Sequence, residues 1–266
     1  MRNIISLLFK TFFLAFFYFN PSAFADNSIN VPILTYHNFD PSVPGSMTIS
    51  TAKFEEQLKW IKDNGYTVIP LKDLVSYLEG KKATLPPKSV VITADDGKKS
   101  VYTYMLPLVR KYNIPVTLFI YPSAISNASY ALTWVQLKEL QETGLFDVQG
   151  HTFWHPNFKQ DKKRLSQADY EKDVHTQLFK SKKVLEDKLN IKVTLLAWPY
   201  GIYDDYLEQQ ATQAGYEMAF SIDGRPANRS EKTMAQPRYM IVQGQSMQEF
   251  EAIVKGQVLG KKYGEN

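Results

Sequence analysis

The sequence contains no cysteine, and only 4 of its 266 residues are histidines. The absence of cysteine excludes disulfide bonds and a lipid-attachment cysteine, so the folded chain must depend on its hydrophobic core. The scarcity of histidine makes the position of each one informative, because two histidines at a close spacing are then an uncommon coincidence.

A strong surplus of one charge is also missing, since 31 basic and 27 acidic residues are interspersed along the chain and leave a net charge of only +4. No basic stripe indicates a nucleic-acid-binding protein, and the mild surplus favours an anionic envelope surface only slightly. Low-complexity segments, clear internal repeats and long linkers are absent after Asp26. With 44% hydrophobic and 14% aromatic residues, the chain can bury one sizeable core, and we expect a single domain.

Residues 1–25 differ from the rest of the chain in having a basic start, an apolar middle and the small residues Ala23 and Ala25. This pattern predicts a secretory signal peptide with cleavage before Asp26. An uncleaved membrane anchor is the alternative, because the apolar run is close to the length that spans a bilayer. In both cases we expect residues 26–266 to form one exported domain in the periplasm, at the cell surface or outside the cell.

Short apolar segments alternate with amphipathic segments over the rest of the chain, which predicts parallel strands connected by helices. The expected strands span residues 31–36, 66–69, 89–93, 116–121, 146–149, 194–198, 216–222 and 239–242. The expected helices span residues 51–64, 71–79, 100–112, 133–142, 166–189, 203–214 and 245–258. This alternation indicates an α/β fold, a closed or nearly closed (β/α)7-8 barrel, rather than a sandwich.

Polar residues follow four of the expected strands directly. His37 follows the first strand, Asp95 and Asp96 follow the third, His151 follows the fifth, and the segment that contains Tyr200 follows the sixth. Catalytic groups of parallel barrels lie at the carboxyl ends of strands, so we expect these residues to share one site.

Two adjacent carboxylates, Asp95 and Asp96, end the third expected strand and precede Gly97. Two neighbouring negative charges are costly unless a positive charge holds them, and a metal ion would do so. If Asp96 binds the metal, the cation keeps Asp95 ionised and able to accept a proton from water. A solvated Asp-Gly turn is the alternative interpretation.

His151 and His155 are four residues apart, so on one helical turn both nitrogens would converge on a single cation. One carboxylate and two histidines leave coordination positions open, which suits zinc as well as iron, cobalt or nickel. Zinc is our first expectation for the divalent metal. Two unrelated histidines on a loop are the alternative.

These residues resemble the motifs of the polysaccharide deacetylases with a nodulation-type deacetylase domain (carbohydrate esterase family 4). The segment Thr93–Gly97 matches the family motif T-F-D-D-G except at Ala94, and His151–Pro156 matches H-[ST]-x-x-H-P in full. The resemblance extends over roughly residues 31–243 and implies a distorted (β/α) barrel that removes acetyl groups from sugars. It also implies a general base at Asp95 and a metal triad of Asp96, His151 and His155.

The third family motif, R-x-P-Y-G, is only partly present, because Ala197 stands where the family has an arginine that orients the base. We expect Arg238, at the start of the last strand, to pair with Asp95 instead. The resemblance implies that the backbone N–H of Tyr200 helps to hold the oxyanion, and that Trp198 and Tyr200 give the cleft an apolar wall.

The late family motif that supplies an acid histidine is absent, since no histidine follows His175. His37, however, ends the first strand as in the branch that deacetylates poly-β-1,6-N-acetylglucosamine, where this histidine is the acid. The resemblance therefore implies that His37 protonates the leaving amine, a task that suits an unperturbed pKa near neutrality. A capping or core histidine is the alternative.

The substrate-binding surface is expected to include aromatic residues near strand ends, because sugars pack on aromatic faces. The candidates are Tyr36, Phe39, Trp134, Trp154, Trp198 and Tyr200. The early histidine favours poly-β-1,6-N-acetylglucosamine, and a role in biofilms follows from the resemblance alone. Peptidoglycan, chitin oligosaccharides and acetylated xylan remain open.

Two other functions compete with polysaccharide N-deacetylation. One is an acetyl-xylan-type esterase or an amidase that uses the same metal site on another acyl group. The other is a catalytically inactive glycan-binding module, which the missing arginine at Ala197 leaves open. We expect an acetylated polysaccharide as the partner, no nucleic acid, and a monomer, with association with the envelope as an open question.

Overall fold

The structure is a computed structural model that describes residues 29–42 and 45–258. The predicted signal peptide, residues 1–25, lies outside the described residues. Within the described ranges, no helix is both long enough and apolar enough to cross a membrane.

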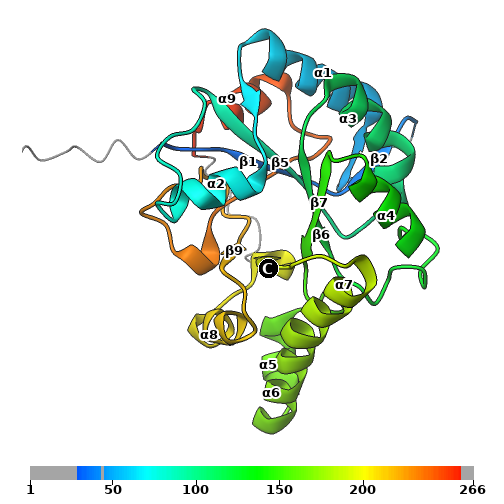
Figure 1. Cartoon of the computed structure of the whole chain (residues 1–266), viewed down its shortest axis with the longest axis vertical. Coiled ribbons are helices and arrows are strands. Elements are labelled where there is room, and N and C mark those ends of the chain that lie inside the picture. Colours follow the sequence, from blue (N-terminus) through cyan, green and yellow to red (C-terminus); the bar gives the residue numbers. More distant parts are fainter. Residues whose placement is uncertain (1–28, 43–44, 259–266) are drawn as a thin grey trace, which may run out of the picture.

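The main sheet of the described chain has eight parallel strands and curls around the centre of the molecule (Figure 1). Seven strands follow one another in the order β10-β1-β5-β6-β7-β8-β9, and β4 pairs with β5 beside this path. Their bounds are β1 (Ile33–Tyr36), β4 (Thr67–Val68), β5 (Ser89–Asp95), β6 (Val116–Ile120), β7 (Phe146–Gly150), β8 (Leu195–Ala197), β9 (Met218–Phe220) and β10 (Tyr239–Met240).

The two ends of the sheet meet where the segment before β10 runs along β9. The N–H of Gln236 donates to the carbonyl of Ala219 at 2.9 Å, and the N–H of Ser221 donates to the carbonyl of Gln236 at 2.9 Å. A parallel bridge also links Phe220 to Gln236. These bonds bring the sheet almost to a closed ring, and the predicted distorted (β/α) barrel is confirmed.

Helices surround the strands, and three of them extend away from the barrel as an arm at the bottom of Figure 1. The arm consists of α5 (Phe158–Arg164), α6 (Gln167–His175) and α7 (Ser181–Leu189), and the π-helical turn η2 (Thr176–Lys180) joins α6 to α7. The other helices are α1 (Thr51–Asp63), α2 (Leu71–Leu78), α3 (Leu106–Tyr112) after the π-helical turn η1 (Val101–Met105), α4 (Trp134–Glu142), α8 (Asp205–Gln213) and α9 (Met247–Val254). Short 3₁₀ turns lie at η3 (Pro199–Gly201) and η4 (Thr233–Ala235).

The core forms because helices cover the outside of strands that are themselves apolar. Every residue of β5 and of β6 is buried, as expected for parallel strands with both faces covered. Helix α1 buries Phe54, Leu58 and Ile61 on one face, as its periodicity predicts. The hydroxyl of Ser50 accepts a hydrogen bond from the N–H of Lys53 at 3.2 Å and caps the start of this helix.

The sequence does not predict three short elements of the fold. Strands β2 (Asn38–Asp40) and β3 (Thr48–Ser50) pair with each other outside the barrel. Helix α5 has Phe158 as its buried residue among charged and polar ones, so no apolar periodicity marks it. The strand expected at residues 66–69 is present as β4, but it lies beside the ring rather than in it.

Candidate active site

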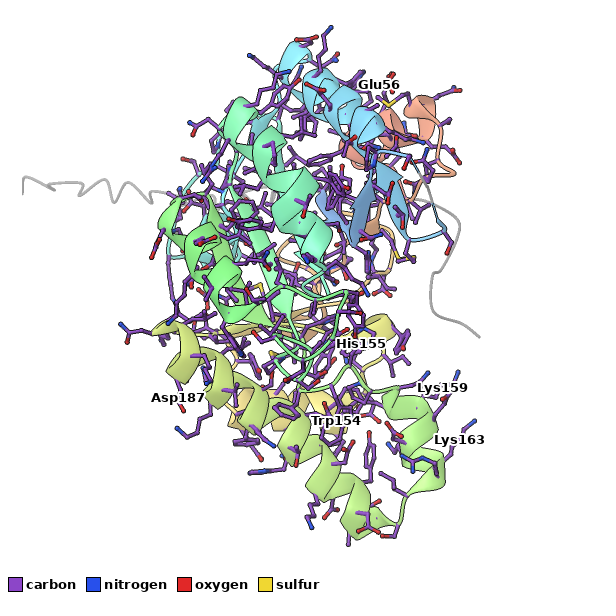
Figure 2. The ribbon with its side chains drawn as sticks, turned by 90° about the vertical axis from the view of Figure 1, so that its right-hand side faces the viewer. Glu56, Trp154, His155, Lys159, Lys163 and Asp187 are labelled. Atoms are coloured by element: carbon purple, nitrogen blue, oxygen red, sulfur yellow. The ribbon has the colours of Figure 1, made fainter. Side chains whose placement is uncertain are left out.

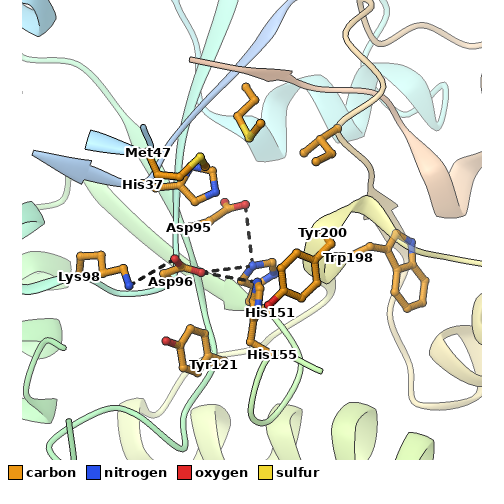
Figure 3. Close-up of a pocket in the computed structure, with 12 residues that line it drawn as sticks. His37, Met47, Asp95, Asp96, Lys98, Tyr121, His151, His155, Trp198 and Tyr200 are labelled. Atoms are coloured by element: carbon orange, nitrogen blue, oxygen red, sulfur yellow. Dashed lines mark ion pairs between the residues drawn. The ribbon is translucent and has the colours of Figure 1, made fainter. Parts of the chain in front are cut away.

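A pocket of about 490 Å³ opens at the carboxyl ends of β1, β5, β7 and β8 (Figure 3). Barrel enzymes place their catalytic groups at this end of the strands. The residues that line it are His37, Met47, Asp95, Asp96, Lys98, Tyr121, His151, His155, Trp198, Tyr200, Ile222 and Met240. The polar residues that the sequence places after four different strands therefore meet in one site.

Asp95, the last residue of β5, forms a bidentate ion pair with Arg238, and both side chains are buried. Nη1 of Arg238 lies 2.9 Å from Oδ1 of Asp95, and Nη2 lies 2.8 Å from Oδ2. The guanidinium also donates to the carbonyl of Ser221 at 3.1 Å and to the hydroxyl of Thr93 at 3.3 Å. Arg238 thus pairs with Asp95, as the sequence predicts for a chain that has Ala197 where the family has an arginine.

The pKa of Asp95 reflects two opposing effects. Burial alone would raise it, but the charge of Arg238, the nearby His151 and the hydrogen bonds from Arg238 together outweigh burial and lower the pKa to about 2. The carboxylate is therefore ionised at neutral pH. A cation on Asp96 is the partner expected from the sequence, and in the structure Arg238 is the buried charge paired directly with Asp95.

Asp96, His151 and His155 converge beside Asp95 (Figure 3). Nε2 of each histidine lies 3.7 Å from Oδ1 of Asp96, and the three candidate ligand atoms lie within 4.8 Å of one another. Atoms bound to one ion at about 2.0–2.2 Å are about 3–3.5 Å apart, so small side-chain movements bring these atoms onto one cation. One carboxylate and two imidazoles fit a divalent metal and leave coordination positions open.

The two histidines lie on the loop after β7, and the prediction that they share a helical turn is wrong. Thr152 has φ 63° and His155 has φ 62°, both in the left-handed region. Pro156 disfavours helical backbone at the residue before it, which is one reason why the loop does not continue as a helix. Asp96, with φ 74°, also has left-handed backbone, so the loops that carry the triad are strained at three positions.

The π-helical turn and the start of α7 hold this loop in place. Oε1 of Gln177 accepts hydrogen bonds from the N–H groups of Phe153 at 3.0 Å and Trp154 at 3.1 Å. The hydroxyl of Ser181 donates to the carbonyl of Thr152 at 2.7 Å. Polar backbone groups that a strained loop leaves unpaired are therefore satisfied by side chains of the arm.

Both imidazoles are prepared to act as metal ligands. Nδ1 of His151 donates to the carbonyl of Ala197 at 2.7 Å, a contact that in the neutral ring leaves Nε2 as the acceptor that faces Asp96. Burial, and then the neighbouring His151, lower the pKa of His155 to about 4. His155 is therefore neutral at neutral pH, the form that binds metals.

His37 follows β1 and lines the same pocket, as the sequence indicated. Its Nδ1 is buried and has no hydrogen-bond partner among the described residues. Burial lowers the pKa of His37, although the nearby Asp95 and Asp96 oppose this effect. The protonated His37 is therefore a stronger acid than an ordinary protonated histidine, and it is less populated at neutral pH. The unperturbed pKa expected for His37 from the sequence is not what the structure gives.

Two of the expected aromatic residues line the pocket. Tyr200 is 51% exposed, and its ring centroid lies 4.6 Å from that of His155. Trp198 is buried, and its indole N–H donates to the carbonyl of Met234 at 2.8 Å. Trp198 and Tyr200 thus form the apolar wall that the sequence analysis expected.

The other aromatic candidates do not line this pocket. The prediction that Tyr36 binds substrate is wrong, because its ring is fully buried and its hydroxyl donates to Gln57 at 2.9 Å. Phe39 is buried beside it. Trp154 is 46% exposed but is not among the residues that line the pocket. Trp134 packs against the core.

Sequence reasoning missed several lining residues. Nζ of Lys98 lies 3.6 Å from Oδ2 of Asp96, and its position directly after Gly97 of the first motif could have indicated it. Tyr121 closes an expected strand and could have been found in the same way. Ile222 also closes an expected strand, whereas no sequence signal marks the remaining apolar lining residues, Met47 and Met240.

Comparison with known sequences identifies the family. The profile described as polysaccharide deacetylase matches residues 82–219, which include Asp95, Asp96, His151 and His155. The chain belongs to this family. A polysaccharide deacetylase is a hydrolase, so the alternative of an inactive glycan-binding module is set aside.

Curated relatives of this polysaccharide deacetylase resemble it over most of its length. The poly-beta-1,6-N-acetyl-D-glucosamine N-deacetylase of Staphylococcus aureus is 29% identical over 213 residues, which are 78% of this chain and 71% of the relative. A putative polysaccharide deacetylase of Bacillus subtilis, YxkH, is 27% identical over 226 residues, 85% of this chain and 76% of the relative.

Solved structures agree with the fold of this polysaccharide deacetylase. The Streptococcus pyogenes deacetylase PplD, in complex with acetate, superimposes with a TM-score of 0.75 at 25% identity over 85% of this chain and 99% of PplD. IcaB from Ammonifex degensii has a TM-score of 0.73 at 22% identity over 85% of this chain and 96% of IcaB, which supports the barrel fold alone.

Proposed function

We propose that this polysaccharide deacetylase is a metal-dependent N-deacetylase of poly-β-1,6-N-acetylglucosamine that releases acetate. The observation that carries the proposal is the convergence of Asp96, His151 and His155 on one side of the arginine-paired Asp95. This arrangement places a candidate metal site and an ionised carboxylate in the same pocket.

In this proposal Asp95 is the general base that accepts a proton from the attacking water. Its pKa of about 2 makes it a weak base, which needs an acidified water. A divalent metal held by Asp96, His151 and His155 would supply Lewis acidity, which lowers the pKa of water toward neutrality. Arg238 keeps both oxygens of the base in place, so that proton transfer needs no side-chain rotation.

His37 is the proposed general acid, which gives its proton to the nitrogen that leaves as the amine. It lines the pocket with Asp95, and its lowered pKa makes the protonated form a stronger acid, although this form is the less populated one at neutral pH. The backbone N–H of Tyr200 is the proposed donor to the oxyanion, and the rings of Tyr200 and Trp198 are the proposed contacts to the sugar.

Two observations support β-1,6-linked N-acetylglucosamine as the substrate. His37 stands at the end of β1, and the Staphylococcus aureus relatives that match 78% of this chain are named as deacetylases of this polymer. We further propose that the protein is exported, because residues 1–25 have the pattern of a signal peptide.

The test measures acetate release from β-1,6-linked N-acetylglucosamine oligomers before and after treatment with a chelator, and after addition of zinc, cobalt, nickel or iron. We expect release that the chelator abolishes and one of the metals restores. The His155→Ala variant should lose both metal binding and turnover. The matched control is His175→Ala, because His175 is exposed on α6, where its ring stacks on Phe179.

Release that survives complete removal of metal would overturn the proposed metal dependence. Metal-dependent release from chitin, peptidoglycan or acetylated xylan oligomers, but not from the β-1,6-linked ones, would overturn the proposed substrate and leave the metal site intact.

A further inference from the structure

A second groove, of about 300 Å³, borders the catalytic pocket. It lies between α5, the start of α6 and residues 202–207. The rings of Phe158, which lines the groove, and Trp198, which lines the pocket, have centroids 6.3 Å apart. Tyr200 lines the pocket and Ile202 lines the groove, so the same short segment borders both. The pocket and the groove therefore lie on either side of residues 198–202.

The rim of the groove carries positive charge that the fold does not neutralise. Lys159, Lys162 and Lys163 line it, and only Lys162 has an ion pair among the described residues, with Asp204 at 2.6 Å. Lys159 and Lys163 are exposed and four residues apart on α5, on the same side of the molecule as His155 (Figure 2). Like charges at this spacing repel each other on a helix, although Lys163 also lies in the last turn of α5, where a cation is favourable.

A buried hydroxyl in the groove also lacks a partner. Tyr170 is only 2% exposed and lines the groove, but its hydroxyl has no hydrogen-bond partner among the described residues. Buried hydroxyls are nearly always paired, so an unpaired one beside a groove indicates a group that a ligand supplies. Phe158 and Tyr203 add aromatic surface of the kind that packs against sugar rings.

We propose that this basic groove, defined by Lys159, Lys163, Tyr170 and Tyr203, binds a sugar unit that carries a carboxylate or a phosphate in a substituted β-1,6-linked N-acetylglucosamine chain, a group that the unsubstituted polymer lacks. The unit is not the one that loses its acetyl group, because the groove lies outside the catalytic pocket. The two lysines bind the anionic substituent, and the hydroxyl of Tyr170 pairs with a sugar hydroxyl. The inference rests on the proposed function in that one glycan occupies both the pocket and the groove.

The test compares three β-1,6-linked N-acetylglucosamine oligomers of equal length, substituted with carboxymethyl, phosphate or neutral hydroxyethyl groups. At low salt we expect KM for acetate release to be roughly fivefold lower for an anionic oligomer than for the hydroxyethyl one, with similar kcat. The carboxymethyl and phosphate arms identify which anion is preferred. High salt should remove the difference, because these charges are exposed.

The Lys159→Gln/Lys163→Gln variant should lose the preference for the anionic oligomers and keep its KM for the hydroxyethyl oligomer. The matched control is Lys59→Gln/Lys62→Gln on α1, which removes the same charge from exposed lysines on another helix. We expect this control to retain the full preference.

The Tyr170→Phe variant separates binding from packing. If the hydroxyl binds substrate, KM should rise about threefold for all three oligomers while kcat and the melting temperature do not fall. If the hydroxyl only sits in the core, KM should not change.

Equal KM values for the three oligomers in the unmodified enzyme, or an unchanged preference in the double lysine variant, would overturn the inference. The absence of acetate release from all three oligomers would instead contradict the proposed function. In that case, calorimetric titration of the carboxymethyl and hydroxyethyl oligomers still decides the inference, because equal affinities would reject the basic groove.

Discussion

At the scale of single residues, the site depends on the different surroundings of two adjacent carboxylates. Asp95 is buried and bound on both oxygens by Arg238, whereas Asp96 faces the two histidines. The backbone turns between them, since Asp96 has φ 74°. Two residues of the same type thus have different environments, which suit the proposed roles of Asp95 as base and Asp96 as metal ligand.

The first prediction concerns Asp95→Asn, which removes the proposed base and leaves Asp96, His151 and His155 unchanged. We expect turnover to fall at least about 10³-fold, because an amide cannot accept the proton of water. Metal affinity, measured by calorimetry, should stay within a few fold. Since the change also breaks a buried ion pair, circular dichroism should first show that the variant is folded.

Turnover close to that of the unmodified enzyme would contradict the assignment of Asp95 as the base. A loss of metal binding together with turnover would indicate instead that Asp95 belongs to the metal site.

At the scale of elements, the part of the arm that consists of α6, η2 and α7 has a structural role at the active site. Its π-helical turn directs Gln177 towards the loop that carries His151 and His155, and Ser181 binds the same loop one turn later. π-helical turns within helices are frequent at functional sites. These helices therefore support the loop that carries the candidate metal ligands His151 and His155.

The second prediction is that Gln177→Ala weakens metal binding although Gln177 touches no metal ligand directly. The change leaves the N–H groups of Phe153 and Trp154 without their acceptor, so the unfolding free energy should fall by about 2 kcal/mol. The loop should then hold its histidines less precisely, and metal affinity should fall about 10-fold or more. Calorimetry with zinc measures the affinity.

The control is Thr176→Ala in the same turn, because the hydroxyl of Thr176 donates to the carbonyl of Lys172 in its own helix. Equal metal affinity in both variants would show that Gln177 does not position the loop.

The third prediction concerns Asp147 on β7. Burial raises its pKa, and the hydrogen bond from Gln149 opposes this effect only in part. A carboxyl group whose pKa is higher in the folded state contributes stability below the pKa of the unfolded chain, and that contribution is lost as pH rises through the folded pKa. Asp147→Asn should therefore raise the melting temperature at about pH 7, with a smaller gain at about pH 4.

Thermal unfolding at the two pH values measures this difference. A gain of the same size at both would show that the effect of the substitution is not linked to the proton on Asp147.

The sequence predicts elements well where an apolar pattern decides the structure, and poorly where tertiary contacts decide it. All eight expected strands are present, because a parallel strand with both faces covered needs a run such as that of β5. Helix α5 and the π-helical turn were not predictable, since Phe158 alone anchors the first and the second depends on its contact with the histidine loop.

The same distinction applies to the site. The motif around Asp95 and the pair His151 and His155 identify the residues, but spacing alone suggested a helical turn where the backbone forms a strained loop. Arg238 lies far from Asp95 in the sequence, and only the closure of the barrel brings them together. A position at the end of a strand does not by itself place a side chain in the pocket, because the side chain of Tyr36 points into the core.

At the scale of the whole molecule, one side chain links the active site to the closure of the barrel. Arg238 stands directly before β10 and binds Asp95 and Thr93 on β5, while its Nε donates to the carbonyl of Ser221 just after β9. The guanidinium thus connects three strands around the ring, at the place where the sheet ends meet. Its loss should affect both the fold and the chemistry.

The fourth prediction is that Arg238→Met lowers the unfolding free energy by about 3–5 kcal/mol, because it leaves Asp95 charged and unpaired in a buried site. Arg238→Lys should recover part of this loss, since lysine keeps the charge but cannot bind both carboxylate oxygens and the Ser221 carbonyl in one plane. The control is Arg225→Met, which removes a partly exposed arginine paired with Glu231 and should cost about 1 kcal/mol or less. Denaturant unfolding measures all three variants, and an Arg238→Met variant no less stable than Arg225→Met would show that the barrel closes without this buried ion pair.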